Sequence, residues 1–109
     1  MTDRLGAVLT AISDPTRRAI INRLARGPAR VTDVAAPFPV SLNTVSKHVK
    51  ALERARLVRR TRRGREHMLT LNAEPLRAVI RWVSRYERFW NERLDRLEAF
   101  FDAGKEELR

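Results

Sequence analysis

Residues 41–54 are the stretch that most constrains the fold. Their apolar side chains, at Leu42, Val45, Val49 and Leu52, recur at steps of three, four and three. On a helix of 3.6 residues per turn they share one stripe. The opposite face carries cations and short polar groups, namely Asn43, Thr44, Lys47, Lys50 and Arg54, with His48 at its flank. Ser41 is placed to cap the start. The pattern predicts an amphipathic helix, either a solvated surface helix or one that meets a polyanion.

The distribution of charge favours the polyanion. The chain has 109 residues, enough for one domain, and a formal net charge of +10. Residues 41–67 hold nine Lys or Arg against two Glu, a net of +7, whereas residues 68–109 hold eight of each sign. Phosphates attract such cations, and short polar side chains on the same helix suit base edges. A localised basic region beside a neutral tail is typical of nucleic-acid binding.

Other classes of function find little support in the sequence. There is no cysteine, so disulfides and thiolate metal sites are excluded, and two histidines are too few for a closed metal site. No apolar run approaches the roughly 18 residues of a membrane span, and no secretory signal precedes the first helix. No catalytic triad, phosphate-binding glycine loop or paired-carboxylate motif stands out. We expect a cytoplasmic protein that is not an enzyme, needs no cofactor and does not enter a membrane.

Two helices are predicted near the N-terminus. Residues 4–12 place Leu5, Val8, Leu9 and Ile12 on one face. The next helix has Asp14 as its N-cap, Pro15 at its first position and Gly27-Pro28 as its stop signal.

A third, short helix is expected over residues 31–36, capped by Thr32 and ended by Pro37. A turn over residues 38–40 then leads into residues 41–54. A short helix, a tight turn and a cationic amphipathic helix together predict a helix-turn-helix.

The hydrophobic period changes to two after Leu57. Residues 58–62 and 67–71 read as strands joined by Arg63-Gly64-Arg65-Glu66, which predicts a hairpin. Arg62, Arg63 and Arg65 crowd its tip. Such arginines would solubilise an edge hairpin, but their mutual repulsion after a helix-turn-helix favours a wing that touches phosphates or enters the minor groove.

From Asn72, read as an N-cap, to about Phe101 the pattern is helical again. The apolar stripe of this helix continues well past the reach of a small core, through Tyr86, Phe89, Trp90, Leu94, Leu97 and Phe101. Those side chains need a second surface, and a symmetric dimer supplies one. Core or dimer packing is the commoner role of such aromatics, although they would also suit an effector cavity.

Three motifs resemble those of the ArsR-type winged helix-turn-helix repressors of bacteria. They are Ile-Ser-Asp-Pro-Thr-Arg-Arg-Ala-Ile at residues 12–20, Val-Ser-Lys-His-Val-Lys-Ala-Leu-Glu at residues 45–53, and the wing from Leu57-Val58 to Arg63-Gly64-Arg65. The C-terminal Trp82-Val83…Tyr86…Phe89-Trp90 resembles a metal-free subgroup. Two departures stand out: the family's thiolate metal ligands are absent, and Arg56 occupies the position after the recognition helix where Gly is expected.

The resemblance implies a homodimeric repressor that covers an operator in double-stranded DNA. Its DNA contacts would fall on Ser41, Asn43, Thr44, Ser46, Lys47, His48 and Lys50, with Arg62, Arg63 and Arg65 on the backbone or minor groove. Its dimer interface would include Leu5, Val8, Leu9, Tyr86, Phe89, Trp90, Leu94, Leu97 and Phe101. Release by a small-molecule effector and autoregulation alone both stay open.

The expected architecture is a mainly α winged helix-turn-helix with a small β-hairpin, in the order α-α-α-α-β-β-α. A single domain over residues 1–109 would comprise dimerisation helices at 1–12 and 72–103, the helix-turn-helix at 31–55, the wing at 57–71 and a tail at 104–109. The alternative is a protein-interaction module that binds a partner chain through its aromatic C-terminal helix, with non-specific DNA binding secondary.

Overall fold

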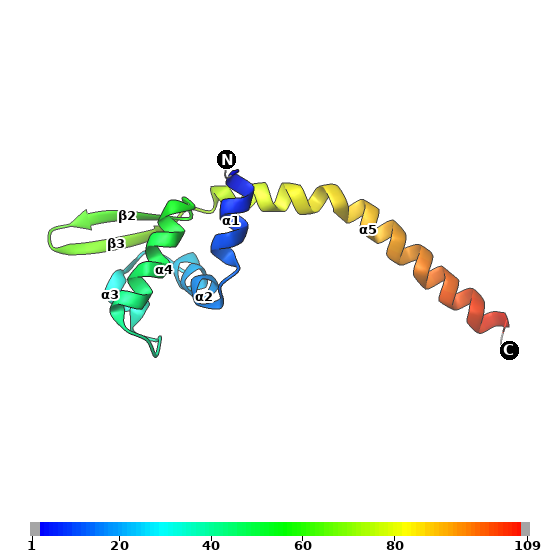
Figure 1. The fold of residues 1–109 in the computed structure, drawn as a ribbon, viewed down its shortest axis with the longest axis horizontal. Helices are drawn as coiled ribbons and strands as arrows, with labels where there is room; N and C mark the ends of the chain where they lie inside the picture. The colour runs from blue at the N-terminus through cyan, green and yellow to red at the C-terminus, as the bar shows by residue number, and fades with distance from the viewer. Residues whose placement is uncertain (1–2, 108–109) are drawn as a thin grey trace. The chain divides into compact units, whose positions relative to one another are not determined.

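The computed structural model describes residues 3–107 and has five helices and three strands in these residues (Figure 1). In chain order they are α1 (Arg4–Ile12), α2 (Pro15–Ala25), β1 (Ala29–Arg30), α3 (Val31–Ala35), α4 (Leu42–Arg54), β2 (Val58–Arg63), β3 (Glu66–Leu71) and α5 (Glu74–Glu107). The predicted winged helix-turn-helix is confirmed, with the addition of the short strand β1. The chain divides into two compact units, one ending at Val79 and one beginning at Ile80.

The sheet of the first unit is antiparallel, in the order β1-β3-β2. Val58 pairs with Leu71 at the base of the wing, and Arg63 pairs with Glu66 at its tip. Both strands are therefore one residue longer than predicted, and the turn shrinks to two residues. Gly64, at φ 63°, takes the first of these positions, where a left-handed conformation favours glycine.

The core of the first unit lies between the helices and one face of the sheet. Its fully buried side chains are Val8, Ile20, Val34, Val45, Val49, Leu52, Leu57 and Leu69. They come from α1, α2, α3, α4 and β3, together with the residue before β2. The recognition helix thus buries Val45, Val49 and Leu52 as its spacing predicts, but Leu42 does not join them. Leu42 opens the helix and is 50% exposed, because the first turn of α4 extends beyond the core.

The N-termini of three helices are capped by acceptor side chains. Asp3 accepts from the backbone N–H of Gly6, Asp14 from that of Arg17 at 3.0 Å, and Ser41 from that of Thr44 at 3.1 Å. These bonds satisfy N–H groups that the first turn leaves without a partner. The caps predicted at Asp14 and Ser41 are confirmed.

The cap predicted at Thr32 is wrong. Helix α3 begins at Val31, so Arg30 and not Thr32 occupies the N-cap position, and it makes no side-chain cap. The guanidinium of Arg30 instead binds the Asp33 carboxylate in the first turn at 2.9 Å. The negative charge of Asp33 there also interacts favourably with the positive end of the helix dipole.

Helix α4 ends in a Schellman motif with Arg56 in the left-handed region, at φ 61°. The N–H of Leu57 donates to the Leu52 carbonyl and that of Arg56 to the Glu53 carbonyl, both at 2.9 Å. Arg56 thus stands, with its Cβ, in the left-handed position where the family pattern leads one to expect glycine. Leu52 and Leu57 are both fully buried, which supplies the apolar contact of the motif.

Helix α5 begins at Glu74, so the prediction that Asn72 caps it is wrong. Asn72 lies two residues before the helix, and its side-chain amide donates to the Arg56 carbonyl. The expected tail at residues 104–109 is also wrong in part, because the helix continues to Glu107. Its 34 residues correspond to about 51 Å. Within the part of the chain that the structure describes, no helix is both long and apolar enough to cross a membrane.

Candidate nucleic-acid interface

The outer face of α4 presents the polar side chains predicted to meet DNA. Ser41, Asn43, Thr44, Lys47 and Lys50 are exposed, whereas Ser46 and His48 are half-buried. The hydroxyls of Ser41 and Thr44 lie 2.9 Å apart, so the first turn is ordered by a side-chain hydrogen bond in addition to the cap. The face combines two free cations with an amide and a hydroxyl, groups that suit phosphates and base edges respectively.

His48 is more constrained than its place in the sequence suggests. Arg17 Nε on α2 donates to His48 Nδ1 at 3.2 Å, and Asp14 Oδ1 lies 3.9 Å from the same nitrogen. The side chain of His48 is only 21% exposed. Sequence reasoning missed Arg17, which lies 31 residues away, because only the packing of α2 on α4 brings the two together.

Asp14 is held in its ionised form. The backbone N–H of Arg17, with a smaller contribution from that of Thr16, lowers the pKa of the Asp14 carboxyl from its ordinary value of 3.8, against partial desolvation. At neutral pH the start of α2 therefore places a carboxylate beside the histidine of the recognition helix.

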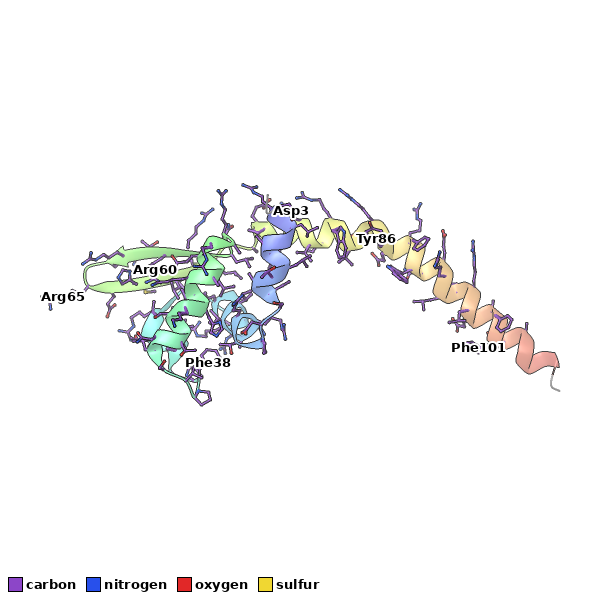
Figure 2. The ribbon with its side chains drawn as sticks, viewed as in Figure 1. Asp3, Phe38, Arg60, Arg65, Tyr86 and Phe101 are labelled. Carbon is purple, nitrogen blue, oxygen red and sulfur yellow. The ribbon has the colours of Figure 1, made fainter. Side chains whose placement is uncertain are left out.

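The wing carries its arginines at an exposed tip. Arg62, Arg63 and Arg65 are all exposed, and Figure 2 shows Arg65 at the end of the β2–β3 hairpin. Arg62 Nε donates to the Gly64 carbonyl at 2.9 Å, which braces the turn. Three cations, two at the end of β2 and one in the turn, form a compact positive site in which Glu66 is the carboxylate nearest in sequence.

Arg60, lower on the wing, has a different role. Its guanidinium donates twice to Glu53 Oε1 on α4, at 2.8 and 3.2 Å. This ion pair connects the wing to the end of the recognition helix. Arg60 is consequently neutralised within the protein, while the tip arginines are left for an external anion.

Arg30 joins the other side of the sheet to α3. It binds Asp33 at 2.9 Å and Glu66 of β3 at 3.0 Å. The hydrogen bonds that Arg30 donates to the Asp33 carboxylate, and then to that of Glu66, raise the pKa of Arg30, and the bond that Asp33 accepts from Arg30 lowers the pKa of Asp33. The helix-turn-helix and the wing are thus connected by ion pairs at both α3 and α4.

The second unit is the remainder of α5 from Ile80, and its apolar side chains are exposed in the single chain. They include Trp82, Val83, Tyr86, Phe89, Trp90, Leu94, Leu97, Phe100 and Phe101, each between 40% and 73% exposed. Figure 2 labels Tyr86 and Phe101 on this helix. Trp82 meets Tyr86, and Phe89 meets Trp90, edge to face with centroids 5.6 and 5.9 Å apart. The Arg93 guanidinium lies 4.2 Å from the Phe89 ring centroid.

The predicted interface residues of α1 differ from those of α5 in exposure. Val8 is 1% exposed and belongs to the core of its own chain, so its side chain is closed to a partner. Leu5 and Leu9 are half-buried and keep some surface free. A partner meeting α1 would therefore touch Leu5 and Leu9 but not Val8. Among the residues described, no group of three or more His, Cys, Asp or Glu side chains is arranged to hold a metal ion.

A capped amphipathic helix with a polar outer face, preceded by a short helix and followed by a basic hairpin, defines the class of winged helix-turn-helix DNA-binding proteins. A family model described as a helix-turn-helix domain matches residues 12–61. The chain belongs to the ArsR-type family of winged helix-turn-helix transcriptional regulators and repressors. It is accordingly a DNA-binding regulator and not an enzyme.

Two relatives and two solved structures illustrate this membership. The HTH-type transcriptional regulator Rv2034 of Mycobacterium tuberculosis is 38% identical, with 85% of this chain and 84% of that protein covered. The transcriptional repressor SdpR of Bacillus subtilis is 36% identical over 70% of this chain and 84% of its own length.

The crystal structure of an ArsR family transcriptional regulator is similar with a TM-score of 0.77 and 36% identity, covering 82% of this chain and 98% of the other. A solution structure of a homodimeric winged helix-turn-helix DNA-binding domain from Mycobacterium bovis, a possible ArsR-family regulator, has a TM-score of 0.64 and 25% identity. It covers 77% of this chain and 81% of the other.

Proposed function

We propose that the protein is a homodimeric repressor that binds an operator in double-stranded DNA and thereby covers a promoter in the cytoplasm. Helix α4 would lie in the major groove, and the wing would contact the backbone or the adjacent minor groove. The observation that carries the proposal is that α4 has one buried apolar face and one outward polar face. Three of its apolar side chains are fully buried, while Asn43, Lys47 and Lys50 face outward.

The electrostatics of the wing support the same proposal. Arg63 and Arg65 are exposed and lie beyond the Arg60–Glu53 ion pair, so the positive charge at the tip is not neutralised where the wing meets α4. Contacts from such arginines to phosphates contribute affinity and position the protein without reading sequence. The base-reading role then falls to Asn43, Thr44, Ser46 and, beside them, His48.

A second copy of the same chain is the proposed partner of α5. Its exposed apolar side chains exceed what a soluble monomer ordinarily leaves open, and a two-fold axis would let the same face cover itself. The homodimeric state of the Mycobacterium bovis domain supports this choice. A dimer of this kind would read an inverted repeat with half-sites about 34–36 Å apart, one turn of the duplex.

The test is fluorescence anisotropy with DNA from upstream of the protein's own gene and with shuffled DNA of the same composition. We expect a preference for the upstream DNA that persists at physiological salt, because base contacts are less sensitive to salt than phosphate contacts. Equal binding to both duplexes that disappears as salt is added would contradict sequence-specific repression.

The alternative, a protein-interaction module that binds a different chain through α5, predicts that non-selective result. It also predicts that the protein is a monomer when that partner is absent. The relatives, which are transcriptional regulators and repressors, do not favour it.

A further inference from the structure

We propose that Arg17 is a positioning residue: it holds His48 as the neutral tautomer with its proton on Nε2, so that the ring offers one N–H donor to the duplex. The proposal concerns the hydrogen bond between Arg17 Nε and His48 Nδ1. It rests on the proposed function in one respect, namely that the acceptor is on DNA.

The assignment of the proton follows from the donor chemistry of arginine. A guanidinium has N–H donors and no acceptor, so a contact at 3.2 Å between Arg17 Nε and His48 Nδ1 is favourable only when Nδ1 accepts. A nitrogen that accepts carries no proton. In neutral imidazole the single proton is then on Nε2, which becomes a donor and no longer an acceptor.

Arg17 is itself held in place from two sides. Its backbone N–H is bound by the Asp14 carboxylate at 3.0 Å, and its Nη1 lies 3.4 Å from the Thr10 carbonyl at the end of α1. These two bonds hold both the backbone and the guanidinium of Arg17 in place where it contacts α4. Because His48 is only 21% exposed, its ring is also restricted, and its Nδ1 edge is directed toward α2.

Asp14 competes with Arg17 for the same nitrogen. Asp14 Oδ1 lies 3.9 Å from His48 Nδ1, too far for a hydrogen bond, but its negative charge favours a proton on that nitrogen. Arg17 on α2 and Asp14 at its N-cap are the charged groups found against Nδ1, and Lys47 is the neighbouring cation on α4. Without the Arg17 guanidinium, Asp14 would be the charged group nearest Nδ1. The ring proton would then move from Nε2, the nitrogen proposed to meet DNA, to Nδ1.

The position of His48 makes this transfer relevant to recognition. His48 lies one helical turn after Thr44, next to the exposed Lys47. In the described residues, Nε2 of His48 has no hydrogen-bond partner within the chain, so its donor is available to a purine N7 or a phosphate oxygen. With the proton on Nδ1 instead, Nε2 would be an acceptor and would face acceptors on the duplex, which is unfavourable.

The first experiment measures the tautomer in the free, full-length protein. Long-range ¹H–¹⁵N spectra at neutral pH distinguish protonated from unprotonated ring nitrogens, and the chain has only one other histidine, His67. We expect an unprotonated Nδ1 and a protonated Nε2 for His48. Arg17→Ala should move the His48 Nδ1 signal toward that of a protonated nitrogen. Arg18→Ala is the control, because it removes the same charge at the next residue. The Arg18 side chain donates to the Ile12 carbonyl, so its loss should leave the His48 Nδ1 signal unchanged.

A protonated Nδ1 in the wild-type protein would overturn the proposal, and so would His48 signals that Arg17→Ala leaves unchanged. The wild-type measurement needs no variant to fold and no DNA. A protein that shows the expected tautomer but binds all DNA alike would contradict the proposed function while leaving the role of Arg17 intact.

The second experiment is a double-mutant cycle on the upstream duplex. We expect Arg17→Ala to weaken binding about tenfold more than Arg18→Ala, the effect of one lost hydrogen bond. In a His48→Ala background the two arginine variants should bind equally, because Arg17 acts through His48. A full loss from Arg17→Ala in that background would mean that Arg17 meets DNA itself, and would overturn the proposal. A His48→Ala loss confined to the upstream duplex identifies a base acceptor, and an equal loss on shuffled DNA identifies a phosphate.

Discussion

The side-chain amide of Asn72 donates to the backbone carbonyl of Arg56 at 2.8 Å, which joins the end of the wing to the end of the recognition helix. The Asn72 N–H adds a second bond, to the Leu57 carbonyl at 2.7 Å. The two acceptors are the carbonyls of Arg56, which is left-handed, and of Leu57, the next residue. The wing therefore starts and finishes at one small junction, and its direction depends on the backbone conformation of a residue that would be glycine in most such turns.

Arg56→Gly should stabilise the protein. A residue with a Cβ at φ 61° is strained, and glycine relieves the strain at some entropic cost to the unfolded chain. We expect the free energy of unfolding to rise by about 0.5–1 kcal/mol, measured by urea denaturation. Arg56→Ala is the control, since it removes the same charge and keeps the Cβ. An equal gain in both variants would assign the effect to charge.

Arg63→Ala and Arg60→Ala should separate DNA affinity from stability. Loss of Arg63 should weaken binding to all duplexes alike and reduce the slope of log K against log salt by about 0.9 if one phosphate contact is lost. Arg60 is bound to Glu53, so its removal should lower the free energy of unfolding by up to about 1 kcal/mol and leave the salt slope unchanged. Anisotropy titrations over a salt series and urea denaturation measure the two effects. An unchanged slope for Arg63→Ala would remove the wing from the phosphate contacts.

Asn43→Ala and Thr44→Ala should change which sequence the protein prefers. An exposed amide or hydroxyl that reads a base edge contributes about 1–3 kcal/mol at one base pair and little elsewhere. Binding to a set of duplexes with single base-pair changes should therefore lose discrimination at particular positions. If each variant instead weakens every duplex by the same factor, these residues contact the backbone.

Leu97→Glu should dissociate the proposed dimer and abolish binding to the upstream DNA. Leu97 is 51% exposed within the apolar face of α5, and a carboxylate would be buried there without a partner. Ala99→Glu adds the same charge nearly opposite on the helix, two residues further on, and should leave the dimer intact. Sedimentation equilibrium measures the mass of each variant. A Leu97→Glu protein that remains dimeric would show that another face makes the interface.

Asp14→Asn should reduce the acid sensitivity of folding. Because the folded protein holds the pKa of Asp14 below 3.8, the unfolded chain binds a proton more readily. The stabilisation is complete above that pH and is lost as pH falls through the lowered folded value. Asparagine also caps helices well but does not titrate. Urea denaturation between pH 6 and pH 2.5 should give a shallower decline for the variant; parallel curves would contradict the assignment.

Features encoded within a few neighbouring residues could be predicted from the sequence. The cap at Ser41, the apolar steps from Val45 to Leu52 and the change of period after Leu57 all operate over one or two turns, and the structure contains each of them. The sequence also shows that position 56 is one where glycine is expected, but the left-handed conformation of Arg56 there comes from the structure.

The features that were missed depend on contacts between distant segments. Strand β1 has only two residues, too few for a period, and exists because Ala29 and Arg30 pair with β3. The Arg17–His48 bond requires α2 to pack on α4. The sequence pattern indicated that Asn72 caps a helix, but its side-chain amide donates instead to the Arg56 carbonyl, 16 residues earlier.

The short strand β1 also sets where the wing can bend. It pairs with β3 only at Met68 and Leu69, so the sheet is three-stranded at that level and the wing is two-stranded from there to Gly64. A two-stranded ribbon is less stable and twists more readily than a wider sheet. Amide hydrogens near the tip should therefore exchange with solvent sooner than those in the part of the sheet beside β1. In the proposed complex, the tip would follow the width of a groove through its own local twisting, while α4 keeps its orientation.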